Sequence, residues 1–134
     1  MPNVDLSDIG KKNDPVEFEY AWKDVVLYAL SVGATPQEFS LVYENAPDGL
    51  KVLPSFCVIP SLKAFPDVGD VDWPLFLHGE MSIRLHRPLP PEGKIVQIGE
   101  VKNIYDKGKG AVYDICITGR TTDGELLYEA GYVN

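Results

Sequence analysis

The sequence contains little of what marks several common classes of protein. Its two cysteines lie in separate apolar runs, with no CxxC or Cys/His spacing that would indicate a zinc site or a disulfide framework. No apolar stretch approaches the roughly 20 residues of a membrane span. A net charge of −8 offers no electrostatic footprint for nucleic acid. These absences exclude metal, membrane and nucleic acid as expected partners, and they favour an intracellular protein with reduced thiols.

The composition, 45% hydrophobic and 24% charged, is that of an ordinary globular protein. A length of 134 residues is enough for a single domain at 1–134 with a hydrophobic core. Residues 1–14 are polar, and we expect them to be extended. The segment YAWKDVVLYALSV at 20–32 carries apolar residues at i, i+3, i+4, i+7 and i+8, counted from Trp22. Gly33 follows as a C-cap. The sequence therefore predicts an amphipathic helix there.

The middle of the chain is harder to interpret from its pattern. LVYE at 41–44 is expected to form a short strand. The apolar segment at 52–65 is interrupted by Pro54 and Pro60, so it fits either a broken helix or a buried extended segment. Periodicity does not decide between these two structures.

The second half of the chain reads as β-structure. Alternating apolar and polar residues predict strands that are joined by turns at DKGKG and TTDG. The predicted strands span residues 81–86, 94–105, 111–119 and 125–133. Within the second of these strands, Gly99 is expected to mark a bulge after Val96 and Ile98. A sheet with one apolar face needs a cover, which only the first half can provide. The expected fold class is therefore α+β, a curved antiparallel sheet packed on one or two helices.

Five stretches of the sequence, in this order, are similar to one known family. They are DVVLYALSVGA (24–34), LVYE (41–44), VLPSFCVIP (52–60), HGEMSIRLHRPLPPEGK (78–94) and YDKGKGA (105–111). Together they resemble the N-terminal half of the type 2, (R)-specific enoyl-CoA hydratases of the MaoC-like dehydratase family. The resemblance implies a hot-dog fold and a part in hydrating trans-2-enoyl-CoA to (R)-3-hydroxyacyl-CoA in fatty acid β-oxidation. VDLSDIGKK near the N-terminus resembles the start of a stand-alone hydratase 2.

In that family two hot-dog repeats share one chain, and a D-x-N-P-x-H motif in the second repeat supplies the catalytic acid and base. This chain has no such motif. The resemblance therefore implies a non-catalytic, acyl-binding repeat of a lyase that needs no metal or prosthetic group, with coenzyme A arriving as part of the substrate. The expected partners are a fatty enoyl-CoA and either a catalytic hot-dog repeat or a second copy of this chain.

The resemblance also points to individual residues. Glu44 matches a family position where a carboxylate matters for activity, and it could orient an active-site group. Lys107, Gly108, Lys109 and Gly110 could contact the phosphates of coenzyme A, since lysine provides charge and glycine allows close approach. The alternatives to these functional roles are purely structural. Glu44 would then lie at the surface end of a strand, and the lysines would lie on a solvated hairpin tip.

Pro54, Phe56 and Val58 fall where a hot-dog protein has its central helix. A helix shortened by the prolines would leave apolar volume for an acyl tail, and plain core packing is the alternative.

His78 and Glu80 form the other candidate pair. They are two residues apart, so on a strand their side chains share a face and could act as acid and base. The alternative, which we favour, is a histidine that anchors the entry to a strand, with Glu80 on its polar face. His86 is expected on the solvent face of the same strand.

Two other functions stay open at this stage. The chain could be a stand-alone hot-dog acyl-CoA thioesterase that uses Glu80 or Glu44 with water, or a non-enzymatic subunit of a separate catalytic chain. If no second repeat covers the sheet edge, we expect the chain to form homo-oligomers. A eukaryotic source would imply a peroxisomal location, and any other source a cytoplasmic one.

Overall fold

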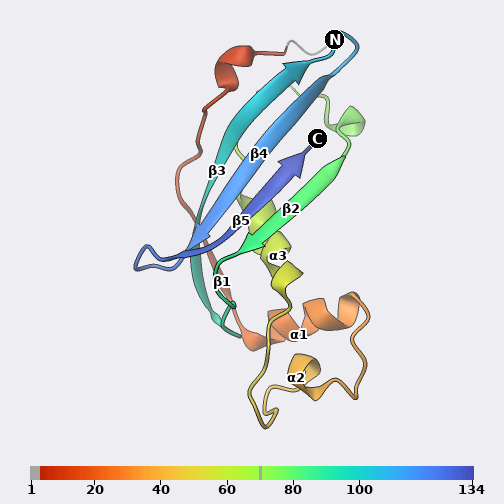
Figure 1. Cartoon of the computed structure of the whole chain (residues 1–134), viewed down its shortest axis with the longest axis vertical. Coiled ribbons are helices and arrows are strands. Elements are labelled where there is room, and N and C mark those ends of the chain that lie inside the picture. The colour runs from red at the N-terminus through yellow and green to blue at the C-terminus, as the bar shows by residue number, and fades with distance from the viewer. Residues whose placement is uncertain (1–3, 70) are drawn as a thin grey trace.

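A single antiparallel sheet organises the chain in the computed structural model, which describes residues 4–69 and 71–134. Its five strands lie in the order β1-β3-β4-β5-β2 (Figure 1). They are β1 (Val16–Tyr20), β2 (Glu80–Leu85), β3 (Gly93–Asp106), β4 (Ala111–Arg120) and β5 (Leu126–Val133). The predicted strands of the second half are confirmed, and β1 and β2 form the two edges.

Helix α1 (Trp22–Ser31) confirms the predicted amphipathic helix. The Asp24 carboxylate accepts a hydrogen bond of 2.8 Å from the backbone N–H of Ala21, which satisfies a donor at the start of the helix. Val25 and Ala29 are buried on its inner face. Tyr28 fixes this face in place by donating a hydrogen bond of 2.8 Å to Ser55 Oγ.

The segment at 52–65, whose conformation the sequence left open, is helical but irregular. It consists of a 3₁₀ turn at Pro54–Cys57, the short helix α3 (Val58–Ser61) and a second 3₁₀ turn at Leu62–Ala64. Pro54 occupies the first turn, where a missing N–H is tolerated, and Pro60 lies inside α3, where the helix stays short.

Two expectations for the first half were wrong. LVYE does not form a strand, because its first two residues belong to helix α2 (Phe39–Val42), where Tyr43 N–H donates to the carbonyl of Phe39. The segment has no neighbouring strand to pair with, and local helical hydrogen bonds form instead. Within the segment expected to be extended, Leu6–Asp8 forms a 3₁₀ turn capped by Asp5, while residues 1–3 lie outside the described residues.

The expected bulge at Gly99 is also wrong. Gly99 lies in regular register opposite Ile117, and the register shifts at Lys102, between Val101 and Asn103. Gly99 instead permits close packing, because a Cβ there would lie 2.2 Å from the carbonyl oxygen of Ala64.

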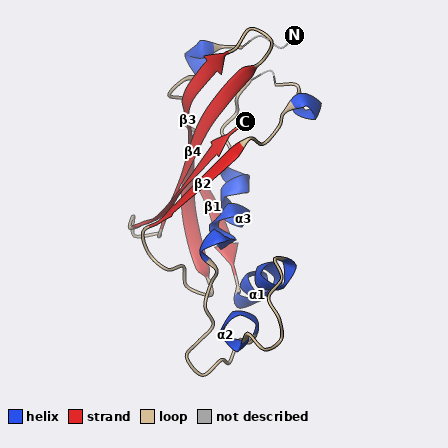
Figure 2. Ribbon diagram, turned by 45° about the vertical axis from the view of Figure 1, so that its right-hand side comes forward, coloured by secondary structure: helices blue, strands red, loops and turns tan. Residues whose placement is uncertain are grey.

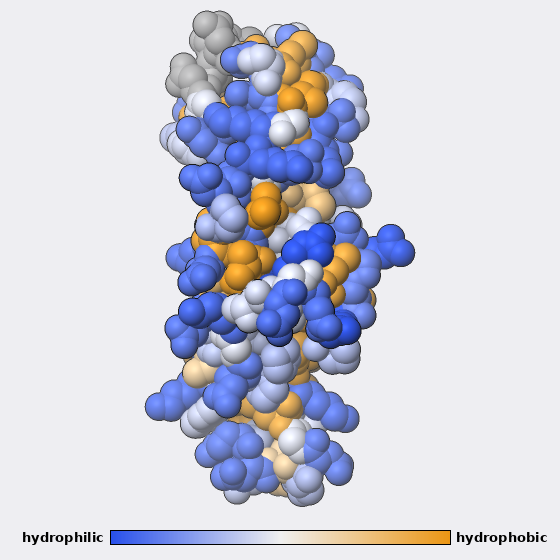
Figure 3. Space-filling model, turned by 90° about the vertical axis from the view of Figure 1, so that its left-hand side faces the viewer, coloured by the Kyte–Doolittle hydropathy of each residue, from blue (hydrophilic) through white to orange (hydrophobic). Residues whose placement is uncertain are grey.

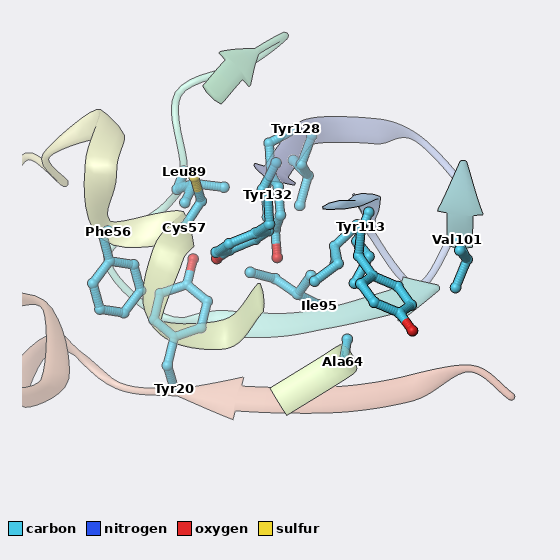
Figure 4. Close-up of a cluster of buried hydrophobic side chains, with 14 of the residues drawn as sticks. Tyr20, Phe56, Cys57, Ala64, Leu89, Ile95, Val101, Tyr113, Tyr128 and Tyr132 are labelled. Atoms are coloured by element: carbon cyan, nitrogen blue, oxygen red, sulfur yellow. The ribbon is translucent and has the colours of Figure 1, made fainter. Parts of the chain in front are cut away.

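The core lies between the inner face of the sheet and the segment 54–64 (Figure 4). Two buried polar residues, Gln97 and Ser61, join the layers. Gln97 Nε2 donates a hydrogen bond of 2.9 Å to the carbonyl of Pro60, and Tyr128 Oη donates to Gln97 Oε1. Ser61 Oγ shares a short hydrogen bond with Tyr132 Oη. The helical segment is thus attached to the sheet at fixed points rather than by apolar contact alone.

Figure 2 shows all three α-helices and the short 3₁₀ helix at Trp73–Leu75 on one side of the sheet. Helices α1 and α2 lie at one end, beyond the end of the sheet, and we call them the lobe. On the flank shown in Figure 3 hydrophilic residues predominate and hydrophobic ones form separate patches. None of the described helices is long and apolar enough to cross a membrane.

Candidate functional site

A cleft of about 480 Å³ opens at the end of the sheet opposite the lobe. It lies between the β3–β4 hairpin and the loop that precedes β2. Its lining is mostly apolar, from Val4, Val71, Leu75, Phe76, Leu77, Ala111 and Tyr113, with polar groups from Asp72, Asp106, Gly108, Lys109, Gly110 and Asn134. Its volume falls within the roughly 300–1,000 Å³ typical of small-molecule sites.

The hairpin wall forms because the sequence after β3 requires a tight turn. Gly108 has φ +81°, a conformation that favours glycine, and its N–H donates a hydrogen bond of 2.8 Å to the Asp106 carboxylate. Lys109 and Gly110 then line the cleft. Lys107 does not, because its Nζ lies 5.6 Å from the centre of the Tyr105 ring. Three of the four residues predicted to contact coenzyme A are therefore at a common site.

The loop wall carries large apolar side chains. Phe76 lies 6.5 Å, ring centre to ring centre, from Tyr113 on β4, which ties the loop to the sheet. Leu75 and Leu77 are 73% and 77% exposed. Burial, with a smaller effect of Asp8 and Asp5, raises the pKa of Tyr113 above its ordinary value, so this residue enters the cleft as a neutral phenol.

The charged groups of the cleft do not favour a strong anion site. Lys109 is accompanied by Asp72 and Asp106, so one cation stands against two carboxylates. A lysine in that setting attracts phosphate weakly and in a salt-dependent way. The arrangement suits an apolar chain inside the cleft and a polar head at its mouth. Among the described residues, no group of three or more His, Cys, Asp or Glu side chains is placed to hold a metal ion.

His78 and Glu80 lie beside this cleft, at the entry to β2. His78 Nδ1 is 3.2 Å from Asn134 Oδ1, and its ring centre lies 5.8 Å from that of Tyr132. Glu80 starts β2 opposite Val133 and is exposed. These contacts tie the histidine to the end of β5 and give it no carboxylate partner among the described residues. His86 Nε2 instead contacts Glu129 Oε2 at 2.9 Å, and this contact lowers the pKa of Glu129.

The remaining predicted residues lie elsewhere. Glu44 is exposed on the loop that follows α2, in the lobe at the far end from the cleft. Phe56 is 1% exposed and packs between the rings of Tyr20 and Tyr28, at 5.2 and 5.7 Å. Neither Pro54 nor Val58 lines the cleft. The roles assigned to these residues stay predictions.

Sequence reasoning missed the loop wall of the cleft. Leu75, Phe76 and Leu77 follow Trp73-Pro74 in a stretch without periodicity, and nothing local indicates that they face the hairpin. The only available signal was a dense group of large apolar residues in a loop, which often marks a binding surface.

A five-stranded antiparallel sheet packed around one helical segment is the hot-dog fold of the MaoC-like dehydratases. The comparisons with known proteins agree with it. Residues 18–132 match the family described as the MFE-2 hydratase 2 N-terminal domain, and the chain belongs to this family.

Three relatives show the extent of the match. The 3-hydroxyacyl-thioester dehydratase Y of Mycobacterium tuberculosis is 38% identical over 126 residues, which cover 91% of this chain and 43% of that protein. The probable enoyl-CoA hydratase 2 of Dictyostelium discoideum is 33% identical, over 90% of this chain and 44% of that protein. The structure of peroxisomal multifunctional enzyme type 2 from Drosophila melanogaster superimposes with a TM-score of 0.77 at 29% identity, covering 90% of this chain and 22% of the other. This chain spans less than half the length of these relatives.

Proposed function

We propose that this chain is the acyl-binding N-terminal half of a 2-enoyl-CoA hydratase 2, which adds water to trans-2-enoyl-CoA to give (R)-3-hydroxyacyl-CoA in fatty acid β-oxidation. The observation that carries the proposal is the family match over residues 18–132 in a chain without the D-x-N-P-x-H motif. A second hot-dog domain then supplies the catalytic acid and base, and this chain holds the substrate.

The cleft supports the acyl-binding part of this proposal. Its apolar walls remove hydrocarbon from water, at about 25 cal/mol per Å² of apolar surface buried. Lys109 and the backbone of Gly108 and Gly110 stand at the hairpin side, where the polar coenzyme A portion leaves the cleft. By holding the acyl chain and excluding water from it, these residues position the double bond for the partner domain.

Hydration adds the hydroxyl of water to the β-carbon and a proton to the α-carbon, so it requires an acid and a base but no net oxidation or reduction of the substrate. We propose accordingly that the reaction uses neither metal nor prosthetic group, and that coenzyme A enters as part of the substrate. In a eukaryote the proposed location is the peroxisome, which is named in the description of the fly relative, and elsewhere it is the cytoplasm.

Binding and turnover test the two halves of the proposal separately. We expect the purified chain alone not to hydrate crotonyl-CoA, and we expect activity when the catalytic half of a relative is added. Turnover by the chain alone that is abolished by His78→Ala would contradict the proposal. Hydrolysis of a saturated acyl-CoA by the chain alone would favour the thioesterase alternative.

A matched pair of substitutions tests the cleft. Ala111→Phe places a ring in the cleft, and we expect it to weaken binding of a long-chain enoyl-CoA at least tenfold by calorimetry. Val112→Phe is the control, because Val112 is the next residue on β4 and its side chain is on the opposite face. Equal effects of both substitutions would place the acyl site elsewhere.

A further inference from the structure

The side chains on the inner face of β4 change size abruptly where the cleft ends. Counted inward from the hairpin, they are Ala111, Tyr113, Ile115 and Ile117. The first two line the cleft, whereas the last two are 0% exposed and lie in the core. A single methyl group thus leaves room at the hairpin end, and the next inward-facing side chain is a large ring.

Tyr113 lies at the boundary between the open cleft and the closed core. In the register of the sheet it lies opposite Ile104, and the next row inward consists of Val101, Ile115 and Tyr132. The residues of that row are at most 3% exposed. Tyr113 itself is 8% exposed although it lines the cleft. A chain that enters at the hairpin therefore meets this ring before it can reach the core.

The ring of Tyr113 is held in place through its backbone and through its packing. The Tyr113 N–H donates a hydrogen bond of 2.8 Å to the carbonyl of Asn134, and the Asn134 N–H donates one of 3.0 Å to the carbonyl of Tyr113. The ring of Phe76 lies 6.5 Å away, centre to centre, at a tilt of 53°. This separation is within the range of favourable aromatic contacts. The inner end of the cleft is therefore a firm wall.

We propose that Tyr113 sets the length of the acyl chain that the cleft holds, by stopping the methyl end of the chain at the boundary with the core. The inference rests on the proposed function of the cleft and adds a residue that selects among substrates. Ala111 provides the room in front of the ring, and the ring provides the stop. A chain of matching length fills the cleft without displacing core side chains, which are packed too densely to yield.

Longer chains find no further apolar space inside the cleft. Their extra methylenes must turn toward the mouth, where Leu75 and Leu77 are 73% and 77% exposed. Methylenes in that position stay largely in contact with water and add little affinity. The affinity should therefore rise with chain length, by roughly fourfold for each methylene buried, until the chain reaches the stop, and it should then level off.

A chain-length profile tests the stop. Calorimetry gives the affinity of the purified chain for a series of trans-2-enoyl-CoA esters that grows from crotonyl-CoA in two-carbon steps. We expect the wild-type affinity to reach a plateau within this series. Tyr113→Ala should move the plateau to a longer ester, which it then binds roughly 15-fold more tightly than the wild type does, because two more methylenes are buried. Tyr113→Leu retains more of the packing and should move the plateau in the same direction.

Two control variants separate the ring from other effects. Tyr113→Phe keeps the ring and removes only the hydroxyl, so the plateau should stay where the wild type has it. Tyr20→Ala removes a tyrosine that is 4% exposed at the lobe end of the sheet, away from the cleft. It should lower stability and leave the plateau in place. A plateau that moves as far in either control as in Tyr113→Ala would overturn the proposal.

The proposed function and the stop fail in different ways. A wild-type chain that binds no enoyl-CoA, or binds all lengths equally, would count against the acyl site itself. Wild-type affinity that rises with every added pair of carbons would refute the stop and leave the acyl site in place. A plateau that Tyr113→Ala and Tyr113→Leu both leave unchanged would do the same.

Discussion

The buried hydrogen bond between Tyr128 and Gln97 offers a direct test of how the central helical segment is held. Both residues are 0% exposed. Tyr128→Phe removes one hydroxyl and leaves Gln97 Oε1 buried without its donor. Leaving a buried polar atom unsatisfied costs about 1–3 kcal/mol. The ring contacts remain, so we expect nearly all of the loss to come from this atom.

Urea unfolding measures the effect. We expect Tyr128→Phe to lower the free energy of unfolding by about 1–3 kcal/mol, and Tyr105→Phe, at a ring 47% exposed, to change it by less than about 0.5 kcal/mol. The double variant Tyr128→Phe/Gln97→Leu should lose less unfolding free energy than the two single variants added together. The reason is that Gln97→Leu removes the oxygen that Tyr128→Phe leaves without a donor. Additive losses, or a Tyr128→Phe protein as stable as wild type, would refute this reasoning.

Three further predictions concern stability. Gly99→Ala should lower the free energy of unfolding by about 1–3 kcal/mol, because its Cβ meets the Ala64 carbonyl, whereas Gly110→Ala, with open space around it, should have little effect in the same urea titration. Burial raises the pKa of Cys57 from 9.0 to about 11, so the unfolded chain loses this proton first as pH rises. The free energy of unfolding therefore falls between pH 9 and pH 11. In Cys57→Ala we expect the fall between pH 9 and pH 10 to be smaller by about 1 kcal/mol. Phe56→Ala should cost about 3–5 kcal/mol by calorimetric unfolding, since the ring is buried between two tyrosines.

Where the sequence pattern was strong, it predicted the structure well. The apolar stripe that begins at Trp22 predicted α1. The alternation through Tyr113, Ile115 and Ile117 predicted β4, where these three residues are buried. In β4 the apolar residues and the buried face coincide, so local periodicity is enough. In α1 the stripe predicts the helix and its buried residues Val25 and Ala29, but its last member, Leu30, is 48% exposed.

The pattern misled in β3 because a polar residue and a glycine take core positions. Gln97 and Gly99 face the helical segment, one to bind the Pro60 carbonyl and the other to let Ala64 approach. Val96 and Ile98 consequently lie on the outer face, although they look like the core stripe. These positions depend on contacts with residues more than 30 places away, which no local window contains.

The candidate site divides in the same way. Gly108 and the hairpin were predictable, since turn chemistry is local. The loop wall at Leu75 and Phe76 was not, because its place against Tyr113 depends on the whole sheet.

The position of the chain ends has a consequence for gene duplication. Val4 and Asn134 line the same cleft, so the two ends of the domain lie together. If a second such domain in the same polypeptide paired with the edge strand β2 in antiparallel orientation, it would begin at the opposite end of the sheet. A connector must then run at least the length of β3, whose 14 residues span about 45 Å. The shortest extended linker that spans this distance has roughly 14 residues. If the linker between two tandem domains were shorter, each domain would have to pair with a domain of another polypeptide.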